Sequence, residues 1–166
     1  MHLPFICFFK CGRARDMFIS LPGLTLAIDE KAKYEEMMTT ASKAIRNFIN
    51  DEPDNLKIYE MEHPDVLLWA VWCIQQYAKM VSKEECIEKY GALLAEIMEY
   101  LCNENHPNLF LHGNGLLYTN GHDRAVTWMN STANGRPVIP RTGYVVEINA
   151  LWYNALCFVA DLLGTL

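Results

Sequence analysis

Two carboxylates are the strongest candidates for chemistry in this sequence, because each is expected in the first turn of a helix. Asp65 follows Glu62-His63-Pro64 and opens a strongly apolar helical segment, and Glu147 opens the last helical segment after Pro140-Arg141-Thr142-Gly143-Tyr144. A helix start favours negative charge by ~0.3–1 kcal/mol, so either carboxylate taken alone could simply stabilise its helix. That alternative stays open for each of them in isolation.

The surroundings of the two carboxylates favour a sugar-binding site. Trp69, Trp128 and Trp152 occur near them in the sequence, together with asparagines and arginines. Sugars present apolar faces and rings of hydroxyl groups, which aromatic rings and polar groups with several hydrogen-bonding atoms can match. The combination therefore indicates a carbohydrate ligand.

Other kinds of site receive less support. No pair of histidines has the one-turn helical spacing of a common zinc motif, so no metal site is predicted. Gly113-Asn114-Gly115 is not followed by a phosphate-binding helix, and no arrangement resembles a serine or cysteine triad. We expect no cofactor.

Composition limits the class of protein. The 166 residues are 51% hydrophobic with a formal net charge of -6, which fits one globular domain and argues against a nucleic-acid partner. The longest charge-free apolar stretch, Ile148–Ala160, is short of the ~20 residues that a membrane-spanning helix needs. Six cysteines without a Cys-x-x-Cys pair favour a reducing compartment, and a cytoplasmic location is expected.

The elements that must position these residues are helices. Four segments show helical periodicity, and none shows the sustained alternation of a strand. They are Asp29–Asn50, Pro64–Met80, a helix that Ser82 opens with a capping-box pattern to Glu85, and Val145–Leu163. The predicted fold class is all-α, with long loops at the helix ends. The loop from Asn103 to Gly143 is longer than ordinary connections, and such loops are usually functional.

One long motif is specific enough to suggest a family. Val146-Glu147-Ile148-Asn149-Ala150-Leu151-Trp152-Tyr153-Asn154-Ala155-Leu156 closely resembles a signature of the amylo-α-1,6-glucosidase domain of glycogen debranching enzymes. Three further segments resemble the same family in the same order. They are Arg15-Asp16-Met17-Phe18-Ile19-Ser20-Leu21-Pro22-Gly23-Leu24, the run from His63-Pro64-Asp65 to Tyr77, and Thr127-Trp128-Met129-Asn130 followed by Pro140-Arg141.

The resemblance implies part of an (α/α)₆ toroid that hydrolyses the α-1,6-linked glucose at branch points of glycogen or limit dextrin. It implies an inverting mechanism with Asp65 as general acid and Glu147 as general base, and it requires no metal. A helix start suits an ionised base at Glu147. An acid at Asp65 must instead keep its proton, with help from burial against Trp69 or from the charge of Glu62. The substrate-binding residues that it implies are Arg15, Asp16, Trp69, Trp128, Asn130, Arg141 and Trp152.

The sequence also departs from the family. Asn130 stands where the family usually has an aspartate, and residues 1–14 form an arm of uncertain structure before the catalytic segment 15–166. A closed toroid of six helix pairs needs more helices than this sequence supplies, so we expect an incomplete toroid. Val66–Ile74, apolar all round, would then lack some of its cover, and exposed apolar helix faces would favour self-association. The alternatives are a non-catalytic remnant that binds glucan weakly and a helical interaction module.

Overall fold

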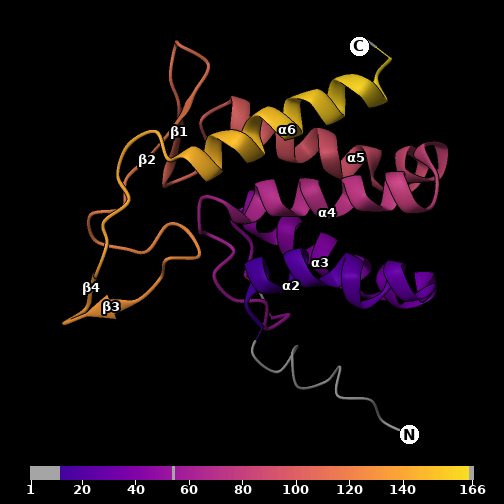
Figure 1. The fold of residues 1–166 in the computed structure, drawn as a ribbon, viewed down its shortest axis with the longest axis horizontal. Coiled ribbons are helices and arrows are strands. Elements are labelled where there is room, and N and C mark those ends of the chain that lie inside the picture. Colours follow the sequence, from indigo (N-terminus) through magenta and orange to yellow (C-terminus); the bar gives the residue numbers. More distant parts are fainter. Residues whose placement is uncertain (1–11, 54, 165–166) are drawn as a thin grey trace, which may run out of the picture.

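Five α-helices run back and forth along one direction and make up most of the described chain (Figure 1). The computed structural model describes residues 12–53 and 55–164. The helices are α2 (Ala14–Leu24), α3 (Lys31–Ile49), α4 (Val66–Met80), α5 (Lys83–Cys102) and α6 (Val146–Leu162), with a short 3₁₀ turn, η1 (Leu26–Ile28), after α2.

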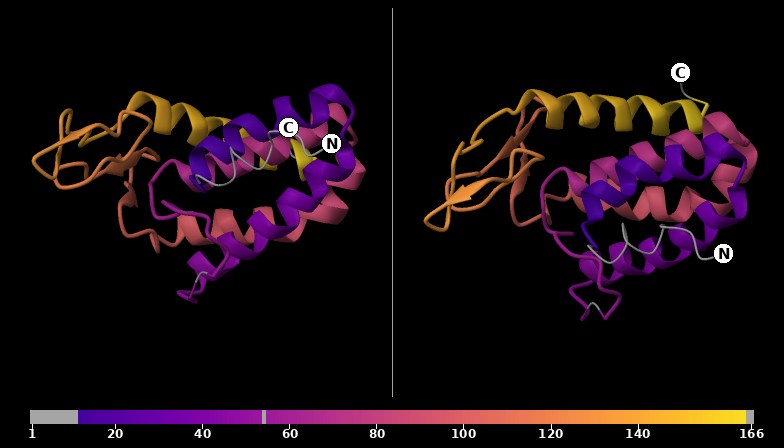
Figure 2. Two further views of the ribbon diagram at one scale, coloured as in Figure 1. Left: turned by 90° about the horizontal axis from the view of Figure 1, so that it is seen from below. Right: turned by 60° about the horizontal axis from the view of Figure 1, so that its bottom comes forward.

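The helices form two layers. α2, α4 and α6 run in the same direction, and α4 lies between the other two and contacts both (Figure 1). α3 and α5 run the opposite way and cover one side of this layer, as the left panel of Figure 2 shows. α3 and α5 carry the chain back to the end at which α2 begins, so α4 and α6 also begin at that end.

The all-α prediction is confirmed, and the four predicted helices begin within two residues of their expected positions. The three helices whose ends were also predicted, α3, α4 and α6, end within one residue of them. The capping box is present, because the Ser82 hydroxyl accepts a hydrogen bond from the backbone N–H of Glu85 at 3.2 Å. α2 was not among the periodic segments. It spans only 11 residues and contains Pro22, so its apolar positions are too few to define a period.

The interior is built around α4. Nearly all side chains from Val66 to Ile74 are buried, and only Trp69 and Trp72 are half-buried. The expectation that this segment lacks cover is therefore wrong, because α2, α5 and α6 together enclose it. The Tyr34 hydroxyl, on α3, donates to the carbonyl of Cys73 at 2.9 Å, which satisfies a polar group in the core.

Two short hairpins lie in the loop between α5 and α6. β1 (Leu109–Leu111) pairs antiparallel with β2 (Leu117–Thr119), and β3 (Thr132–Ala133) pairs with β4 (Arg136–Pro137). Strands of two or three residues are too short to show an alternating pattern, which is why the sequence indicated only a loop. The second hairpin turns at Asn134 and Gly135, whose φ angles of 52° and 77° suit a type I′ turn.

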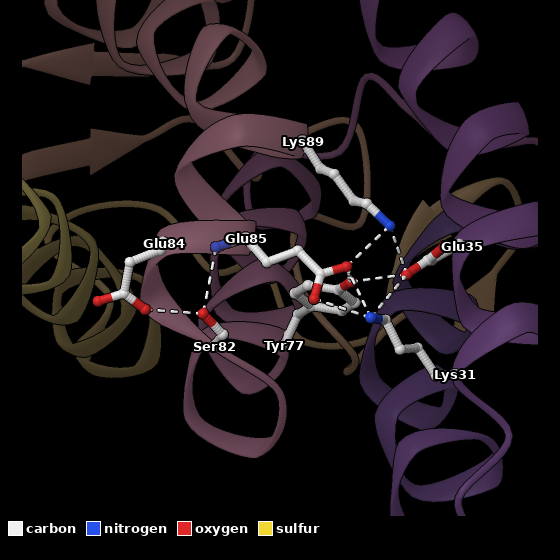
Figure 3. Close-up of polar contacts among 7 residues, drawn as sticks. All are labelled: Lys31, Glu35, Tyr77, Ser82, Glu84, Glu85 and Lys89. Atoms are coloured by element: carbon white, nitrogen blue, oxygen red, sulfur yellow. Dashed lines mark hydrogen bonds and ion pairs between the residues drawn. The ribbon is translucent and has the colours of Figure 1, made fainter.

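A polar network joins the starts of α3 and α5 to the end of α4, opposite the starts of α2, α4 and α6 (Figure 3). Glu85 accepts from Lys31 at 2.6 Å and lies 3.0 Å from Lys89, which also pairs with Glu35 at 2.7 Å. The Tyr77 hydroxyl lies within hydrogen-bond distance of both glutamates. Tyr77 is twelve residues after Asp65, so the network lies about 18 Å along α4 from that carboxylate.

α6 lies at the edge of its layer (Figure 1) and exposes apolar side chains. Val146, Tyr153 and Leu156 are 80%, 71% and 42% exposed. The apolar exposure expected on α4 therefore occurs on α6, whose outer side no described element covers. Among the described residues, no helix combines the length and the hydrophobicity needed to cross a bilayer.

Candidate active site

The starts of α2, α4 and α6 form one end of the parallel layer (Figure 1). Arg15 and Asp16 lie in the first turn of α2, Asp65 is the N-cap residue of α4, and Glu147 lies in the first turn of α6. Residues far apart in the sequence are thus brought to one end of the molecule, because the three helices are parallel. The Asp16 side chain is exposed there.

Asp65 forms a buried ion pair with Arg15. The Arg15 Nε donates to Oδ2 of Asp65 at 2.7 Å, and its Nη2 donates to Oδ1 at 2.8 Å. Each side chain is only 3% exposed. This two-pronged geometry is the strong form of a charge-assisted hydrogen bond, and it joins α2 to α4.

His63 completes this group. Its Nδ1 lies 2.9 Å from Nη2 of Arg15. A guanidinium only donates, so Nδ1 must be the acceptor and cannot carry a proton. Burial, and then the positive charge of Arg15, lower the pKa of His63, which agrees with a neutral imidazole. Arg15 is therefore surrounded by acceptors from the loop that leads into α4.

The ion pair restricts the chemistry of Asp65. Both of its carboxylate oxygens accept hydrogen bonds from Arg15, so neither is positioned to donate a proton in this arrangement. A general acid must present such a proton to the leaving group. Asp65 is buried, as a carboxyl group that keeps its proton would need to be, but it is paired with the positive charge of Arg15.

Glu147 is more open. Its side chain is 34% exposed and pairs with Nη2 of Arg141, whose side chain is 19% exposed. Arg141 Nη1 contacts the sulfur of Met129 at 2.9 Å. The Nε of Arg141 is buried and has no hydrogen-bond partner among the described residues. Glu147 is thus a partly exposed carboxylate paired with a guanidinium.

The segment that carries Arg141 is held against β2. Thr119 and Gly143 exchange backbone hydrogen bonds at 3.0 and 2.9 Å, and the Thr119 hydroxyl donates to the Arg141 carbonyl at 2.9 Å. Gly121 lies so close that a Cβ there would come within 2.6 Å of the Arg141 carbonyl oxygen. Glycine is needed at this contact, and the contact fixes the backbone of Arg141 near Glu147.

The tryptophans and Asn130 lie in different environments. Trp128 is 62% exposed, and Asn130, just after it, is half-buried. Trp152 is only 4% exposed, and its indole N–H donates to the carbonyl of Gly115 at 3.1 Å. Trp69 is half-buried and packs edge-to-face with Trp72, with ring centroids 5.5 Å apart. Trp128 is thus the most accessible of the three predicted sugar platforms.

Sequence reasoning missed residues that position the site. The side chain of Asn149 accepts from the backbone N–H of Leu117 at 2.9 Å and donates to its carbonyl at 3.0 Å, so it pins β2 to α6. His63 was noted only as part of the His-Pro-Asp motif, although it contacts Arg15. Both residues lie in the motifs that resemble the family, and that position is the signal by which they could have been found. No local pattern reveals the residue that either one contacts.

A cavity of about 890 Å³ opens between the end of α3, the loop before α4 and the end of α5, with Phe48, Tyr59, Tyr100, Glu60 and Glu62 in its wall. Of the described residues that line it, none is a predicted site residue. Within the same described part of the chain, no three His, Cys, Asp or Glu side chains group closely enough to hold a metal ion.

Comparison with known proteins agrees with the motifs. A comparison with curated proteins and one with solved structures each give no match. A family model described as amylo-alpha-1,6-glucosidase matches residues 5–165, nearly the whole sequence, and its match includes every predicted site residue. The chain therefore belongs to the amylo-α-1,6-glucosidase family.

Proposed function

We propose that this protein hydrolyses the α-1,6-linked glucose at the branch points of glycogen or limit dextrin. Asp65 acts as general acid and Glu147 as general base, and the anomeric configuration is inverted. Membership in the amylo-α-1,6-glucosidase family supports the substrate class. The observation that carries the mechanism is the placement of both carboxylates at the starts of neighbouring parallel helices.

The helix packing is compatible with an inverting mechanism. α4 and α6 contact each other, and the axes of packed helices lie about 8–10 Å apart. Inverting glycosidases hold their two carboxyl groups about 6.5–9.5 Å apart, which leaves room for a water molecule. Carboxylates at the starts of adjacent parallel helices meet that requirement more readily than carboxylates on one helix.

Glu147 has the properties of a general base. A base must be ionised to take a proton from water, and both the start of α6 and the Arg141 guanidinium favour the ionised form. Its side chain is 34% exposed, so water reaches it.

Asp65 can act as an acid only after Arg15 releases at least one of its oxygens. In the proposal, the arriving glucose competes for the Arg15 guanidinium through its hydroxyl groups, while Asp16 accepts from a neighbouring hydroxyl. Nη2 of Arg15 already has a second acceptor in Nδ1 of His63, so it keeps a partner when the carboxylate is released. The released oxygen is then free to carry the proton that a general acid must present to the leaving group.

The five helices are proposed to be one sector of an (α/α)₆ toroid. Three parallel helices form one layer and two antiparallel helices form the other, which is the alternation of inner and outer helices in such a barrel. The helix starts at one end of the layer correspond to the rim at which substrate enters.

A second candidate function is weak glucan binding without hydrolysis. The observation that favours it is the closed Arg15–Asp65 ion pair, which leaves no donor proton on Asp65. Glu147, Arg141 and Trp128 would still offer a polar and aromatic surface to a sugar. The two candidates therefore differ in whether Asp65 is ever released from Arg15.

The deciding experiment measures free glucose released from a maltooligosaccharide with a single α-1,6 branch. We expect release by the unaltered chain, and loss of release in Asp65→Asn and in Glu147→Gln. Glu88→Gln, an exposed change on α5, serves as the control. Proton NMR of the first product should show β-glucose. Release of α-glucose would overturn the inverting mechanism, and binding without any glucose release would favour the second candidate.

A further inference from the structure

Three aromatic rings from separate elements meet near the start of α6. His112, directly after β1, stacks on Tyr118 of β2 with ring centroids 5.1 Å apart and an interplanar angle of 15°. Tyr144 stands edge-on to both rings, at 5.5 and 5.7 Å. Its hydroxyl lies 2.7 Å from Nδ1 of His112. We call these residues the three-ring cluster.

The three-ring cluster is open to solvent, unlike a cluster of three tyrosines in the core. Tyr34, Tyr77 and Tyr90 also contact one another, but all three are buried in the core. In the three-ring cluster Tyr144 is 46% exposed, His112 is exposed and Tyr118 is half-buried. Rings that pack together and still face water offer apolar surface edged by hydrogen-bonding atoms.

The three-ring cluster is also held rigidly. Beyond the pairing of β1 with β2, the backbone N–H of His112 donates to the carbonyl of Leu116 at 3.0 Å. α6 fixes the same hairpin at two points, through the two hydrogen bonds of Asn149 to Leu117 and the bond from the Trp152 indole to Gly115. A ligand that binds rings held in place loses little conformational entropy from the protein.

The position of the three-ring cluster connects it to the candidate active site. Tyr144 lies three residues before Glu147, and the backbone pairing of Thr119 with Gly143 joins β2 to the segment that leads into α6. The cluster contains no lysine, arginine or carboxylate, so it suits a neutral ligand. Glucose units of an α-glucan are neutral and combine apolar C–H faces with hydroxyl groups, which rings edged by hydroxyl and imidazole groups can match.

We propose that the three-ring cluster binds glucose units of the linear α-1,4 arm of the substrate, beside the bond that Glu147 helps to hydrolyse. The choice of an α-glucan rests on the proposed function, whereas the open, fixed ring surface does not depend on it. His112, Tyr118 and Tyr144 act as binding residues for the chain that remains after glucose is released. They take no part in the proton transfers.

The test measures the affinity of the full chain for maltohexaose, which contains no α-1,6 bond, by isothermal titration calorimetry. Tyr144→Ala and Tyr118→Ala should each weaken binding about five- to tenfold, the effect expected from losing one aromatic contact. Tyr144→Phe keeps the ring and should stay within about twofold of the unaltered chain. Tyr153→Ala is the matched control, because Tyr153 is 71% exposed on α6 and lies outside the three-ring cluster.

A second measurement needs no substitution. The ring proton resonances of His112 should shift when maltohexaose is added to the unaltered chain, even if an alanine variant fails to fold. An unaltered chain that does not bind maltohexaose would overturn the proposal, and so would unchanged affinity in both alanine variants. Absence of glucose release from the branched substrate, with binding that still depends on Tyr144, would remove the proposed hydrolysis and leave this inference standing.

Discussion

The guanidinium of Arg15 and the carboxylate of Asp65 are joined by two hydrogen bonds of 2.7 and 2.8 Å at the contact between α2 and α4. Both side chains are 3% exposed, so water contributes little to the solvation of either charge. The pair therefore fixes two helices of the parallel layer and also controls whether Asp65 can carry a proton. Its structural and its chemical consequences can be tested separately.

Removing one partner of this buried pair should be costly. Arg15→Met leaves the Asp65 charge buried without a partner, and we expect the free energy of unfolding to fall by about 3–5 kcal/mol. Urea unfolding at pH 7 measures this change. Arg15→Met combined with Asp65→Leu should recover much of the loss, because no unpaired charge then remains.

The control for this prediction is another two-pronged pair, between Arg46 of α3 and Glu96 of α5. Its side chains are 43% and 40% exposed. Solvent screens such a pair, so Arg46→Met should cost less than about 1 kcal/mol. If Arg15→Met and Arg46→Met lowered the free energy of unfolding equally, burial would not explain the strength of the Arg15–Asp65 pair.

Gly121 should tolerate no side chain. A Cβ at this position would come within 2.6 to 2.8 Å of backbone atoms of Arg141, so that segment must move. We expect Gly121→Ala to lower the free energy of unfolding by about 1–3 kcal/mol and to reduce any glucose release, because Arg141 shifts relative to Glu147. Gly113→Ala is the matched control, since nothing lies within 4 Å of a Cβ there. A stable, fully active Gly121→Ala variant would show that the loop adapts.

His106 should make stability depend on pH between about 6.5 and 4. Burial, and then the electrostatic interaction with nearby His63, lower the pKa of His106 from 6.5 to about 4. The unfolded chain therefore takes up this proton first. The contribution of the neutral His106 ring to the free energy of unfolding is complete above pH 6.5 and is lost as the pH falls to about 4. Each pKa unit corresponds to about 1.4 kcal/mol, so the loss is roughly 3 kcal/mol.

Urea unfolding at pH 7.5, 6 and 5 measures this effect, and His106→Gln should flatten the curve. The flattening will be partial, because the pKa of His63 is also lowered and protonation of His63 also reduces stability as the pH falls. An NMR titration in which the His106 ring protonates near pH 6.5 in the folded chain would rule the prediction out.

Glu85 should make stability depend on pH in a range below that of His106. Hydrogen bonds from Lys31, Lys89 and Tyr77 lower its pKa from 4.5 to about 2. A lowered carboxyl pKa means that the unfolded state binds the proton first, so this contribution is present above pH 4.5 and is lost between pH 4.5 and 2. Glu85→Gln should therefore flatten the dependence of the urea midpoint on pH in this range only.

The comparison variant is Glu88→Gln, because Glu88 is exposed on the same helix. It should leave the dependence of the urea midpoint on pH between 4.5 and 2 unchanged. High salt should reduce the Glu85 effect, because the charged side chains of the network (Figure 3) are partly exposed and dissolved ions screen them. Since the network lies at the far end of α4 from Asp65, any glucose release at neutral pH should be the same in Glu85→Gln and the unaltered chain.

The sequence alone determined four of the five helices of the described chain, and the family. Apolar spacing of three and four residues defines α3, α5 and α6, because one face of each must be buried. The capping pattern of Ser82 with Glu85 placed the start of α5, because that signal lies within four consecutive residues. The signature around Glu147 indicated the family before any tertiary contact was known, since it is contiguous in the chain.

Only the tertiary structure decided the partners of the site residues. Arg15 and Asp65 are 50 residues apart, and the Trp152 indole bonds to Gly115 across 37 residues, so no local pattern could show either contact. Ile87 illustrates the same limit, because it shares an apolar face of α5 with the buried Tyr90 and Leu94 and is nevertheless 47% exposed. Periodicity fixes which residues share a face, but the neighbouring helices decide how much of that face is covered and which charges meet there.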